Sequence, residues 1–342
     1  MLCSKQELFE TIEKINGLPM LVVGDIILDR YIWGSVARVS PEAPVPVVDV
    51  KQVEDRLGGA ANVVRNLCNL GVQVSLCGVI GDDLEGQTVL KLLEKDKVER
   101  DGVIIDRGRP TSLKTRVVAQ KQQMLRIDRE NSSALSPALR EGFAAVVDAH
   151  IDRAKSIIIS DYGKGAISDA LFRKLSEAQQ AKRIGLQARP LVLDPHPANY
   201  SIYQSVTVAK PNRREAELAS GVTITDRDST LEAGRILLKK WKSDMLVITL
   251  GEDGLAIISA NSDRPIFLET VAQEVFDVSG AGDTVTAIFA AALAAGASPA
   301  VAGDLANIGA GVVVSEVGTV AVTIPKLKNE IERLSAVAKK KA

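Results

Sequence analysis

The chain alternates between short apolar runs and longer segments in which apolar positions recur with the period of a helix. The short runs have the length and composition of buried strands, and the periodic segments predict amphipathic helices. The expected strands are Met20–Gly24, Val72–Val79, Ser156–Ser160, Leu191–Leu193 and Met245–Leu250, and the expected helices are Ala60–Leu70, Leu84–Glu94, Asp169–Lys182 and Thr230–Trp241. Such alternation predicts an α/β fold with a mostly parallel sheet that is covered on both faces.

Two segments, Tyr31–Lys51 and Thr111–Asp128, break this alternation. The first contains three prolines and the β-prone run Val45–Val50, and the second is rich in β-branched residues without a helical period. We predict that both form strands of a small antiparallel lid attached to the main sheet. The alternative is that they are two long surface loops. We expect one domain over residues 1–342.

Composition narrows the class of protein. Hydrophobic residues make up 46% and charged residues 25% of the 342 positions, as in ordinary globular enzymes. The net charge of −1 gives no electrostatic reason to expect nucleic acid or an anionic membrane as a partner. No apolar run reaches the roughly 18 residues of a spanning helix. The start of the chain lacks a secretory signal pattern. Cys3, Cys68 and Cys77 have no metal-like spacing, and their odd number argues against a disulfide framework. We therefore expect free thiols and a cytoplasmic protein.

The run Asp277–Thr284, with the sequence DVSGAGDT, precedes a small-residue helix that we predict for Val285–Ala295. Gly280 and Gly282 would allow their backbone N–H groups to approach a ligand closely, and a helix N-terminus favours a phosphate. Asp283 could accept a proton from a hydroxyl at the same place. This combination suits phosphoryl transfer to an alcohol. Tight packing of a helix on a strand would explain the glycines without any ligand.

Three further segments carry candidate chemistry. Leu57–Asn62 holds a second glycine pair, which is either a ligand-binding loop or a plain turn at a helix start. In Lys210–Glu215, Asn212 and Glu215 fall on one side of a first helical turn and could hold Mg²⁺ through water. Taken alone, that spacing is better explained by N-capping. Thr249–Gly254 ends a strand with two glycines, where α/β sheets bind ligands.

These four segments, in this order, resemble the ribokinase or PfkB family of carbohydrate kinases, and the likeness runs from Val22 to Thr323. The resemblance implies a ribokinase-like three-layer α/β/α sandwich with a small β-sheet lid. It also implies a carbohydrate kinase that uses ATP and Mg²⁺.

Four other segments are similar to a narrower group, the kinases that phosphorylate D-glycero-β-D-manno-heptose 7-phosphate at O1 for ADP-heptose and lipopolysaccharide inner-core synthesis. They have the sequences GDIILDRY, SPEAPVPV, QQMLRID and SDYGKG. In that group the kinase is either a separate protein or the first half of a bifunctional protein. The other half is a nucleotidyltransferase with an HxGH motif. No HxGH occurs here, so the chain resembles the kinase part alone.

The family resemblance assigns roles to residues. Asp283 would be the catalytic base, and the backbone N–H groups of Gly280, Ala281 and Gly282 would stabilise the transferring phosphoryl group. The residues expected on the nucleotide side are Asn212, Arg213, Arg214, Glu215, Thr249, Gly251, Gly254 and Asn307, with Asn212 and Glu215 organising Mg²⁺ through water. Those expected to hold sugar hydroxyls are Asp29, Gly58, Gly59 and Asn62.

The 7-phosphate of such a substrate needs cationic partners. Arg116 and Arg126 on the expected lid are candidates, because guanidinium groups match phosphate oxygens, and Lys164 is a third. Each is alternatively an ordinary surface charge. His196 stands where the related kinases have lysine, in Asp-Pro-Lys, and is either a site residue or a surface turn residue.

By the same resemblance, a monovalent cation could bind near Asp277 and the segment Gly311–Gly318. It implies a homodimer formed through the lid, whose strand edges need covering.

Two other functions remain open. The first is a PfkB-type kinase for another sugar, such as ribose, fructose or a phosphorylated hexose. The second is a non-catalytic sugar-binding or regulatory protein on the same fold. Asp283, Gly280 and Gly282 argue against the second, because a protein without catalysis would be free to lose them.

Overall fold

The computed structural model describes residues 2–120, 122–183, 189–272, 275, 277–316 and 318–341. The strands are β1 (Pro19–Val39), β2 (Pro46–Gly59), β3 (Gln73–Gly81), β4 (Val103–Asp106), β5 (Ser112–Ala119), β6 (Gln122–Arg129), β7 (Ser156–Ser160), β8 (Leu191–Asp194), β9 (Val208–Ala209), β10 (Met245–Thr249), β11 (Leu255–Ser259) and β12 (Ile266–Leu268). The α-helices are α1 (Lys5–Ile15), α2 (Ala60–Asn69), α3 (Leu84–Lys95), α4 (Pro137–Ile151), α5 (Asp169–Arg183), α6 (Arg213–Ser220), α7 (Arg227–Trp241), α8 (Ala281–Ala294), α9 (Pro299–Val314) and α10 (Ile324–Lys341).

The main sheet has the strand order β12-β11-β10-β9-β8-β7-β1-β3-β4. Every neighbouring pair from β10 to β4 is parallel, and β11 and β12 add an antiparallel edge. Parallel strands need long crossover connections, and the helices supply them. The predicted mostly parallel sheet is confirmed.

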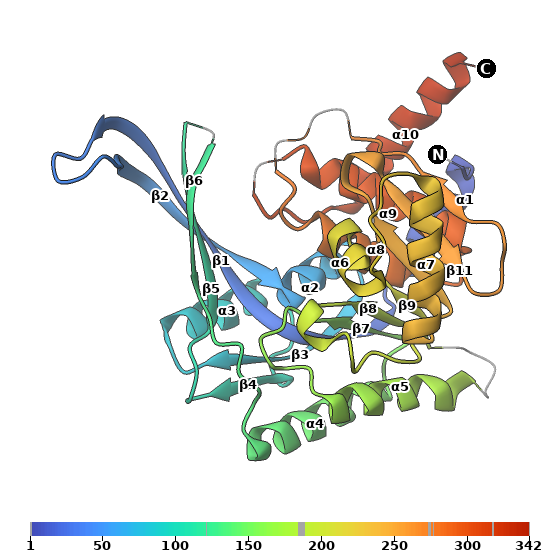
Figure 1. The fold of residues 1–342 in the computed structure, drawn as a ribbon, viewed down its shortest axis with the longest axis horizontal. Coiled ribbons are helices and arrows are strands. Elements are labelled where there is room, and N and C mark those ends of the chain that lie inside the picture. Colours follow the sequence, from blue (N-terminus) through green and yellow to red (C-terminus); the bar gives the residue numbers. More distant parts are fainter. Residues whose placement is uncertain are drawn as a thin grey trace.

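Helices cover both faces of this sheet (Figure 1). Along β1, Met20 and Val22 pack into one apolar core with α1, α2, α8 and α9, whereas Leu21 and Val23 pack into a second core with α4, α5 and α7. A strand buried on both faces loses the hydrophobic–polar alternation, which explains its continuous apolar run. The three-layer α/β/α sandwich is therefore confirmed.

The lid is an extension of the main sheet. β1 runs without a break for 21 residues, from the sheet centre into a projecting arm (Figure 1). There it pairs antiparallel with β2 and parallel with β5, and β6 pairs antiparallel with β5. The alternative of two long surface loops is wrong, but the lid is not purely antiparallel as predicted, because β1 and β5 are parallel.

The lid is larger than predicted at two places. The strand predicted to end at Gly24 continues to Val39, and β2 continues to Gly59, eight residues beyond the expected lid boundary at Lys51. The acidic residues Asp25 and Asp29 interrupt the apolar run of β1 in the sequence, yet both are buried. Buried polar residues hide a strand from pattern analysis, because their burial depends on partners from elsewhere in the chain.

The described residues bear on two further features, membrane-spanning helices and the state of the cysteines. Among them, no helix is both long and apolar enough to cross a bilayer. Cys3, Cys68 and Cys77 are free thiols, as expected.

Candidate active site

A cleft of about 590 Å³ lies at the carboxyl ends of the central strands. Its lining comes from the segments that follow β7, β8, β9 and β10, and from the start of α8. The lining residues are Asp161, Tyr162, Asp194, Pro195, His196, Lys210, Asn212, Arg213, Arg214, Glu215, Thr249, Leu250, Gly251, Val278, Gly280, Gly282 and Asp283. This is the edge of an open α/β sheet at which ligands bind.

Asp283 lies in the first turn of α8, which begins at Ala281 and not at Val285 as predicted. Its side chain is buried, with 5% of the residue exposed. The Asn62 amide donates to Oδ2 at 2.7 Å, and the Tyr162 hydroxyl donates to Oδ1 at 2.7 Å. The glycine-rich segments around residues 57–62 and 277–284 therefore meet at one carboxylate.

The environment of Asp283 raises the pKa of its carboxyl toward neutrality. Burial, and then the negative charge of Asp194, raise the pKa of the Asp283 carboxyl to about 7, although Asn62, Tyr162 and Lys210 act in the opposite direction. A general base is most effective when its pKa lies near the working pH.

The start of α8 could bind an anion beside this carboxylate. Gly280 is the N-cap residue, with a φ of 83°, and a Cβ there would lie 2.8 Å from Nδ2 of Asn62. Only glycine combines this backbone with this close approach. The first N–H groups of a helix have no partner within it. Of the three N–H groups expected to bind phosphoryl, that of Ala281 donates to the carbonyl oxygen of Val278 at 3.2 Å in this structure.

Lys210 adds a buried positive charge beside this turn and is not among the site residues predicted from the sequence. It is 4% exposed, and its Nζ lies 3.0 Å from Oδ1 of Asp194. A Cβ on Gly282 would be 3.4 Å from that ammonium group, so the lysine faces the glycine-rich turn. Thr286 donates to the other oxygen of Asp194 at 2.9 Å. The available signal was that Lys210 and Asp194 are charged residues at the ends of buried strands.

Asn212 and Glu215 form a capping box at the start of α6, which is the alternative to metal binding named in the sequence analysis. The Glu215 N–H donates to Asn212 Oδ1 at 2.9 Å, and the Asn212 N–H donates to Glu215 Oε2 at 2.8 Å. Burial, and then the charge of Asp194, raise the pKa of the Glu215 carboxyl to about 7.

No group of three or more acidic, histidine or cysteine side chains within the described ranges is arranged to hold a metal directly. Asp194 and Glu215 nevertheless bring two carboxylates to the cleft, which fits Mg²⁺ held partly by water and phosphate.

The expected nucleotide residues separate into two groups. Arg213, Arg214, Thr249 and Gly251 line the cleft together with Asn212 and Glu215. Arg213 also donates to the carbonyl oxygen of Leu250 at 2.9 Å and pairs with Asp253, which ties α6 to the turn after β10.

Gly254 and Asn307 do not line this cleft. Gly254 has a φ of 86°, and a Cβ there would lie 2.0 Å from the carbonyl oxygen of Leu268. Asn307 donates from α9 to the carbonyl oxygen of Glu269 at 2.8 Å. Both residues shape the strand connections beside the cleft.

The expected sugar residues lie where the lid leaves the main sheet. Asp29 is 6% exposed and accepts a hydrogen bond from Arg116 at 2.6 Å. A Cβ on Gly58 would lie 2.4 Å from Oδ2 of Asp29, and Gly59, with a φ of 56°, is the N-cap residue of α2. Oδ1 of Asn62 is buried without a hydrogen-bond partner among the described residues. Such an acceptor is suited to a sugar hydroxyl, because an unsatisfied buried polar atom is costly.

The three expected phosphate-binding cations all have acidic partners in this structure. Arg116 pairs with Asp29, Arg126 with Asp128, and Lys164 with Glu130. Arg126 lies directly opposite Arg116 in the register of β5 and β6, so the two side chains share one face of the lid.

His196 lines the cleft and is also the N-cap residue of the short 3₁₀ turn Pro197–Asn199, so both interpretations stay open. Its Nδ1 accepts a hydrogen bond from the Ala198 N–H at 3.3 Å, which places the ring proton on Nε2 when the imidazole is neutral. Burial, and then the positive charge of Lys164, lower the pKa of the His196 imidazole.

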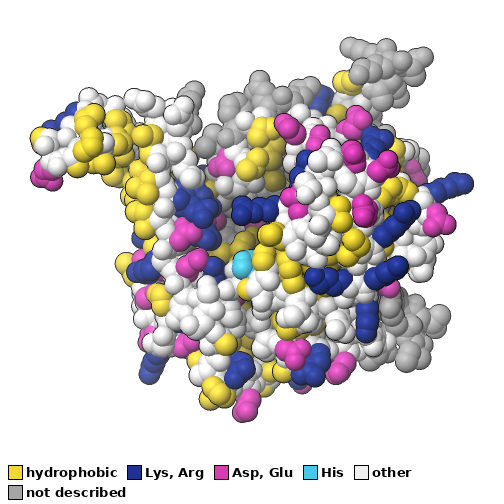
Figure 2. Space-filling model, viewed as in Figure 1, with side chains coloured by type: hydrophobic (Ala, Val, Ile, Leu, Met, Phe, Trp, Pro, Cys, Tyr) yellow, Lys and Arg dark blue, Asp and Glu magenta, His cyan; other side chains and the backbone are white. Residues whose placement is uncertain are grey.

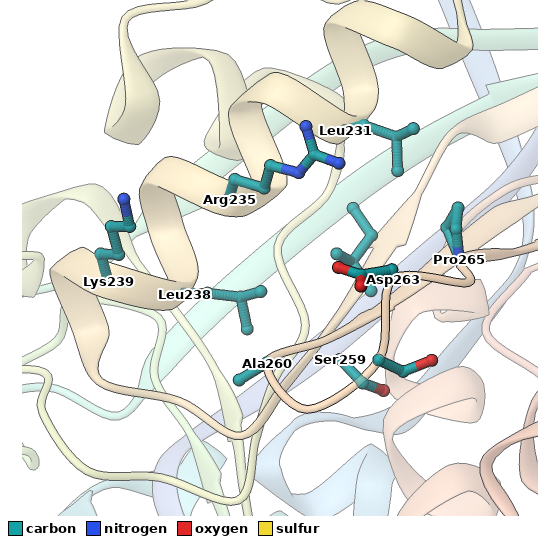
Figure 3. Close-up of a pocket in the computed structure, with 10 residues that line it drawn as sticks. Leu231, Arg235, Leu238, Lys239, Ser259, Ala260, Asp263 and Pro265 are labelled. Atoms are coloured by element: carbon teal, nitrogen blue, oxygen red, sulfur yellow. The ribbon is translucent and has the colours of Figure 1, made fainter.

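A separate hollow of about 280 Å³ lies between α7 and the turn after β11 (Figure 3). Leu231 and Leu238 supply apolar surface, and Arg235, Lys239 and Asp263 supply charge. None of the residues expected at the site lines this hollow.

Comparisons with known proteins identify the family to which the chain belongs. A sequence profile described as pfkB family carbohydrate kinase matches residues 20–327. The chain is 43% identical to "Bifunctional protein HldE" of Pelobacter propionicus over 328 residues, and 42% identical to the protein of the same name from Helicobacter hepaticus over 304 residues. These matches cover 96% and 89% of this chain but 65% and 62% of the two relatives, so the chain corresponds to less than two thirds of their length.

Solved structures show the same fold. Phosphofructokinase-2 from Escherichia coli, in complex with substrates and products, matches with a TM-score of 0.75 at 17% identity, over 93% of this chain and 99% of that one. Ribokinase from Arabidopsis thaliana, complexed with ribose and ATP, matches with a TM-score of 0.68 at 21% identity, over 93% and 98%.

Proposed function

The chain belongs to the pfkB family of carbohydrate kinases, and from that premise we propose that it phosphorylates D-glycero-β-D-manno-heptose 7-phosphate at O1, with ATP as donor. The product would be the 1,7-bisphosphate, an intermediate of ADP-heptose and lipopolysaccharide inner-core synthesis. The observation that carries the reaction type is the buried Asp283 carboxylate in the first turn of α8, where the helix N-terminus could bind a phosphate. The likeness to the HldE proteins, together with the lid segments of the chain, supports the choice of sugar.

Asp283 would accept the proton of the sugar 1-hydroxyl as that oxygen attacks the γ-phosphorus of ATP. The O1–H bond breaks, the O1–P bond forms, and the bond from the γ-phosphorus to the bridging oxygen breaks to release ADP. The N–H groups of Gly280, Ala281 and Gly282, with the ammonium group of Lys210, would stabilise charge on the transferring group. Positioning and electrostatics supply most of the catalysis in such reactions, and one preorganised donor is worth about 2.7–4 kcal/mol.

Mg²⁺ would be held through water by Glu215 and Asn212, with Asp194 close by. When bound, the metal neutralises phosphate charge and orients the ATP phosphates. Arg213, Arg214, Thr249 and Gly251 would bind the nucleotide within the same cleft, and Gly254 and Asn307 would shape its wall. A monovalent cation near Asp277 remains part of the proposal. In the structure the Asp277 carboxylate accepts N–H groups of Ser279 and Gly318, at 2.8 and 3.0 Å.

The sugar would lie between Asp29 and Asp283. Asn62 offers a buried acceptor to a hydroxyl, and Gly58 and Gly59 leave space for the ring. We propose that the 7-phosphate replaces the acidic partners of Arg116, Arg126 and Lys164, because a phosphate carries more negative charge than one carboxylate and offers three acceptor oxygens. The lid would then cover the sugar and exclude water, which limits wasteful hydrolysis of ATP.

We also propose a cytoplasmic homodimer formed through the lid. Large hydrophobic side chains are exposed on the lid strands and their connections: Val39, Val45, Val50, Val53, Met124, Leu125 and Ile127. Figure 2 shows hydrophobic surface along the projecting arm. A contiguous exposed apolar surface on strand edges is a feature of subunit interfaces.

A panel of acceptors tests the proposed function. ADP release and ³¹P NMR would be followed with heptose 7-phosphate, the unphosphorylated heptose, ribose, fructose and fructose 6-phosphate. We expect a new anomeric phosphate only with the heptose, and a much lower kcat/KM when its 7-phosphate is missing. Comparable turnover of another sugar would favour the broader PfkB-type kinase. Sugar-dependent melting shifts without any phosphoryl transfer would favour the non-catalytic alternative.

A further inference from the structure

Tyr162 lies on a loop, residues 161–166, whose backbone is held by a buried carboxylate of β1. Asp25 is 3% exposed and accepts three backbone N–H groups of this loop. They come from Tyr162 at 2.8 Å, Lys164 at 3.0 Å and Ala166 at 3.1 Å. A carboxylate that accepts several N–H groups is a strong anchor, because charge-assisted hydrogen bonds are stronger than neutral ones. The loop is therefore fixed to the sheet strand that also carries Asp29.

Close packing on both sides restricts the loop further. Gly163 and Gly165 have φ values of 67° and 89°. A Cβ on Gly163 would lie 2.4 Å from Nδ1 of His196, and one on Gly165 would lie 2.3 Å from the carbonyl oxygen of Ser133. The loop thus has little room to move, and it directs the Tyr162 phenol into the cleft.

The Tyr162 hydroxyl donates to Asp283 Oδ1 while Asn62 donates to Oδ2, each at 2.7 Å. We propose that Tyr162 is a positioning residue for the catalytic base: its hydroxyl orients the Asp283 carboxylate toward the sugar hydroxyl and keeps it ionised. A carboxylate oxygen can accept two hydrogen bonds, so the sugar hydroxyl can approach while the phenol stays in place. The inference rests on the proposed function in one respect, which is that Asp283 is the base.

The charges around Asp283 explain why such a donor is needed. Burial and Asp194 favour the protonated carboxyl, whereas Lys210, Asn62 and Tyr162 favour the carboxylate. Tyr162 stays a donor, because burial and then the negative charge of Asp283 raise the phenol pKa well above its ordinary value. The phenol therefore counteracts the desolvation that makes Asp283 a base in the first place.

The substitution Tyr162→Phe removes the hydroxyl and keeps the ring. Loss of a hydrogen bond to a charged group should raise the pKa of the Asp283 carboxyl. The acid limb of the plot of kcat/KM against pH should then move to higher pH by about one to two units. The rate at pH 7 should fall about 5- to 50-fold and recover toward the wild-type value near pH 9, with little change in either KM. An unmoved acid limb, or an equal loss at every pH, would overturn the proposal.

A second measurement does not depend on the identity of the sugar. In protein labelled with ¹³C at aspartate carboxyls, the Asp283 signal can be assigned by its absence in Asp283→Asn and then titrated by NMR. Tyr162→Phe should raise its midpoint by about one to two pH units. Tyr200→Phe, which removes a hydroxyl bonded to the carbonyl oxygen of Glu215, should leave the midpoint where it is.

An unshifted midpoint in Tyr162→Phe, or an equal shift in Tyr200→Phe, would refute the assignment. If the midpoint moves as expected but no sugar of the panel is phosphorylated, the proposed function fails while the role of Tyr162 in holding the Asp283 carboxylate ionised stands.

Discussion

At the scale of single residues, Asp194 connects Asp283 and Glu215, two carboxyl groups of the cleft whose pKa is raised. It contributes to the raised pKa of both Asp283 and Glu215, and its own charge is paired with Lys210. We therefore predict that the proposed base Asp283 and the proposed metal residue Glu215 respond to the same change in pH.

The Glu215 carboxyl leads to a prediction about Mg²⁺. Because its pKa is raised to about 7, this carboxyl binds a proton as the pH falls below 7 and then competes less well for the metal. The Mg²⁺ concentration that gives half-maximal activity should rise up to about tenfold per pH unit below 7. In Glu215→Gln it should be higher at pH 8 and nearly independent of pH. Activation titrations at pH 6, 7 and 8 measure this, and a pH-independent requirement in the wild type would contradict it.

The lid arginines give a second residue-scale prediction. Arg116→Ala and Arg126→Ala should raise the KM for heptose 7-phosphate by about 10- to 100-fold, because each removes a charge-assisted hydrogen bond, and should change the KM for ATP much less. Arg140→Ala on α4, which lines no part of the cleft, is the matched control. Equal effects on both substrates would count against a role in binding the 7-phosphate.

At the scale of elements, the site depends on where strands pass into helices. β2 ends at Gly59 and α2 begins at Ala60, so Gly58, Gly59 and Asn62 reach the site from one junction. The sequence predicted this junction and the glycine-rich start of α8, because glycines next to a periodic segment mark helix starts. It did not predict that α8 begins at Ala281, since glycine and aspartate in a first turn look like loop residues.

Gly58→Ala tests the junction between β2 and α2. The added methyl group would meet Oδ2 of Asp29, so Asp29 must move and the sugar KM should rise about tenfold or more. Gly142→Ala on α4 is the control, because a Cβ there has open space and alanine favours a helix, worth up to about 1 kcal/mol of stability. Initial-rate kinetics and thermal melting separate the two effects. An unchanged sugar KM in Gly58→Ala would show that the sugar does not depend on the position of Asp29.

At the scale of the whole molecule, the alternation of strands and helices along the sequence predicted the layered sheet. It did not predict that three further residues belong to the site. Asp194 is the last residue of β8, whereas Tyr162 and Lys210 lie just after β7 and β9, and only the parallel order of these strands brings the three to one cleft. Their contacts with Asp283 and with each other are long-range, so no local sequence pattern carries them.

The exposed apolar surface of the lid predicts an oligomeric state. The protein should sediment as a dimer, and the double substitution Val53→Asp and Leu125→Asp should give a folded monomer, because buried charges without partners oppose association. Leu218→Asp, at an equally exposed leucine on α6, should leave the dimer intact. Sedimentation velocity decides the question, and a monomeric wild type would rule out a dimer through the lid.

The most direct test of the central claim is the turnover of Asp283→Asn at saturating ATP, Mg²⁺ and heptose 7-phosphate, measured as ADP release beside the wild type. Because asparagine cannot accept the proton of the 1-hydroxyl, kcat should fall by about 10²–10⁴-fold while sugar-induced melting shifts persist. Turnover near the wild-type rate would contradict the assignment of Asp283 as the base.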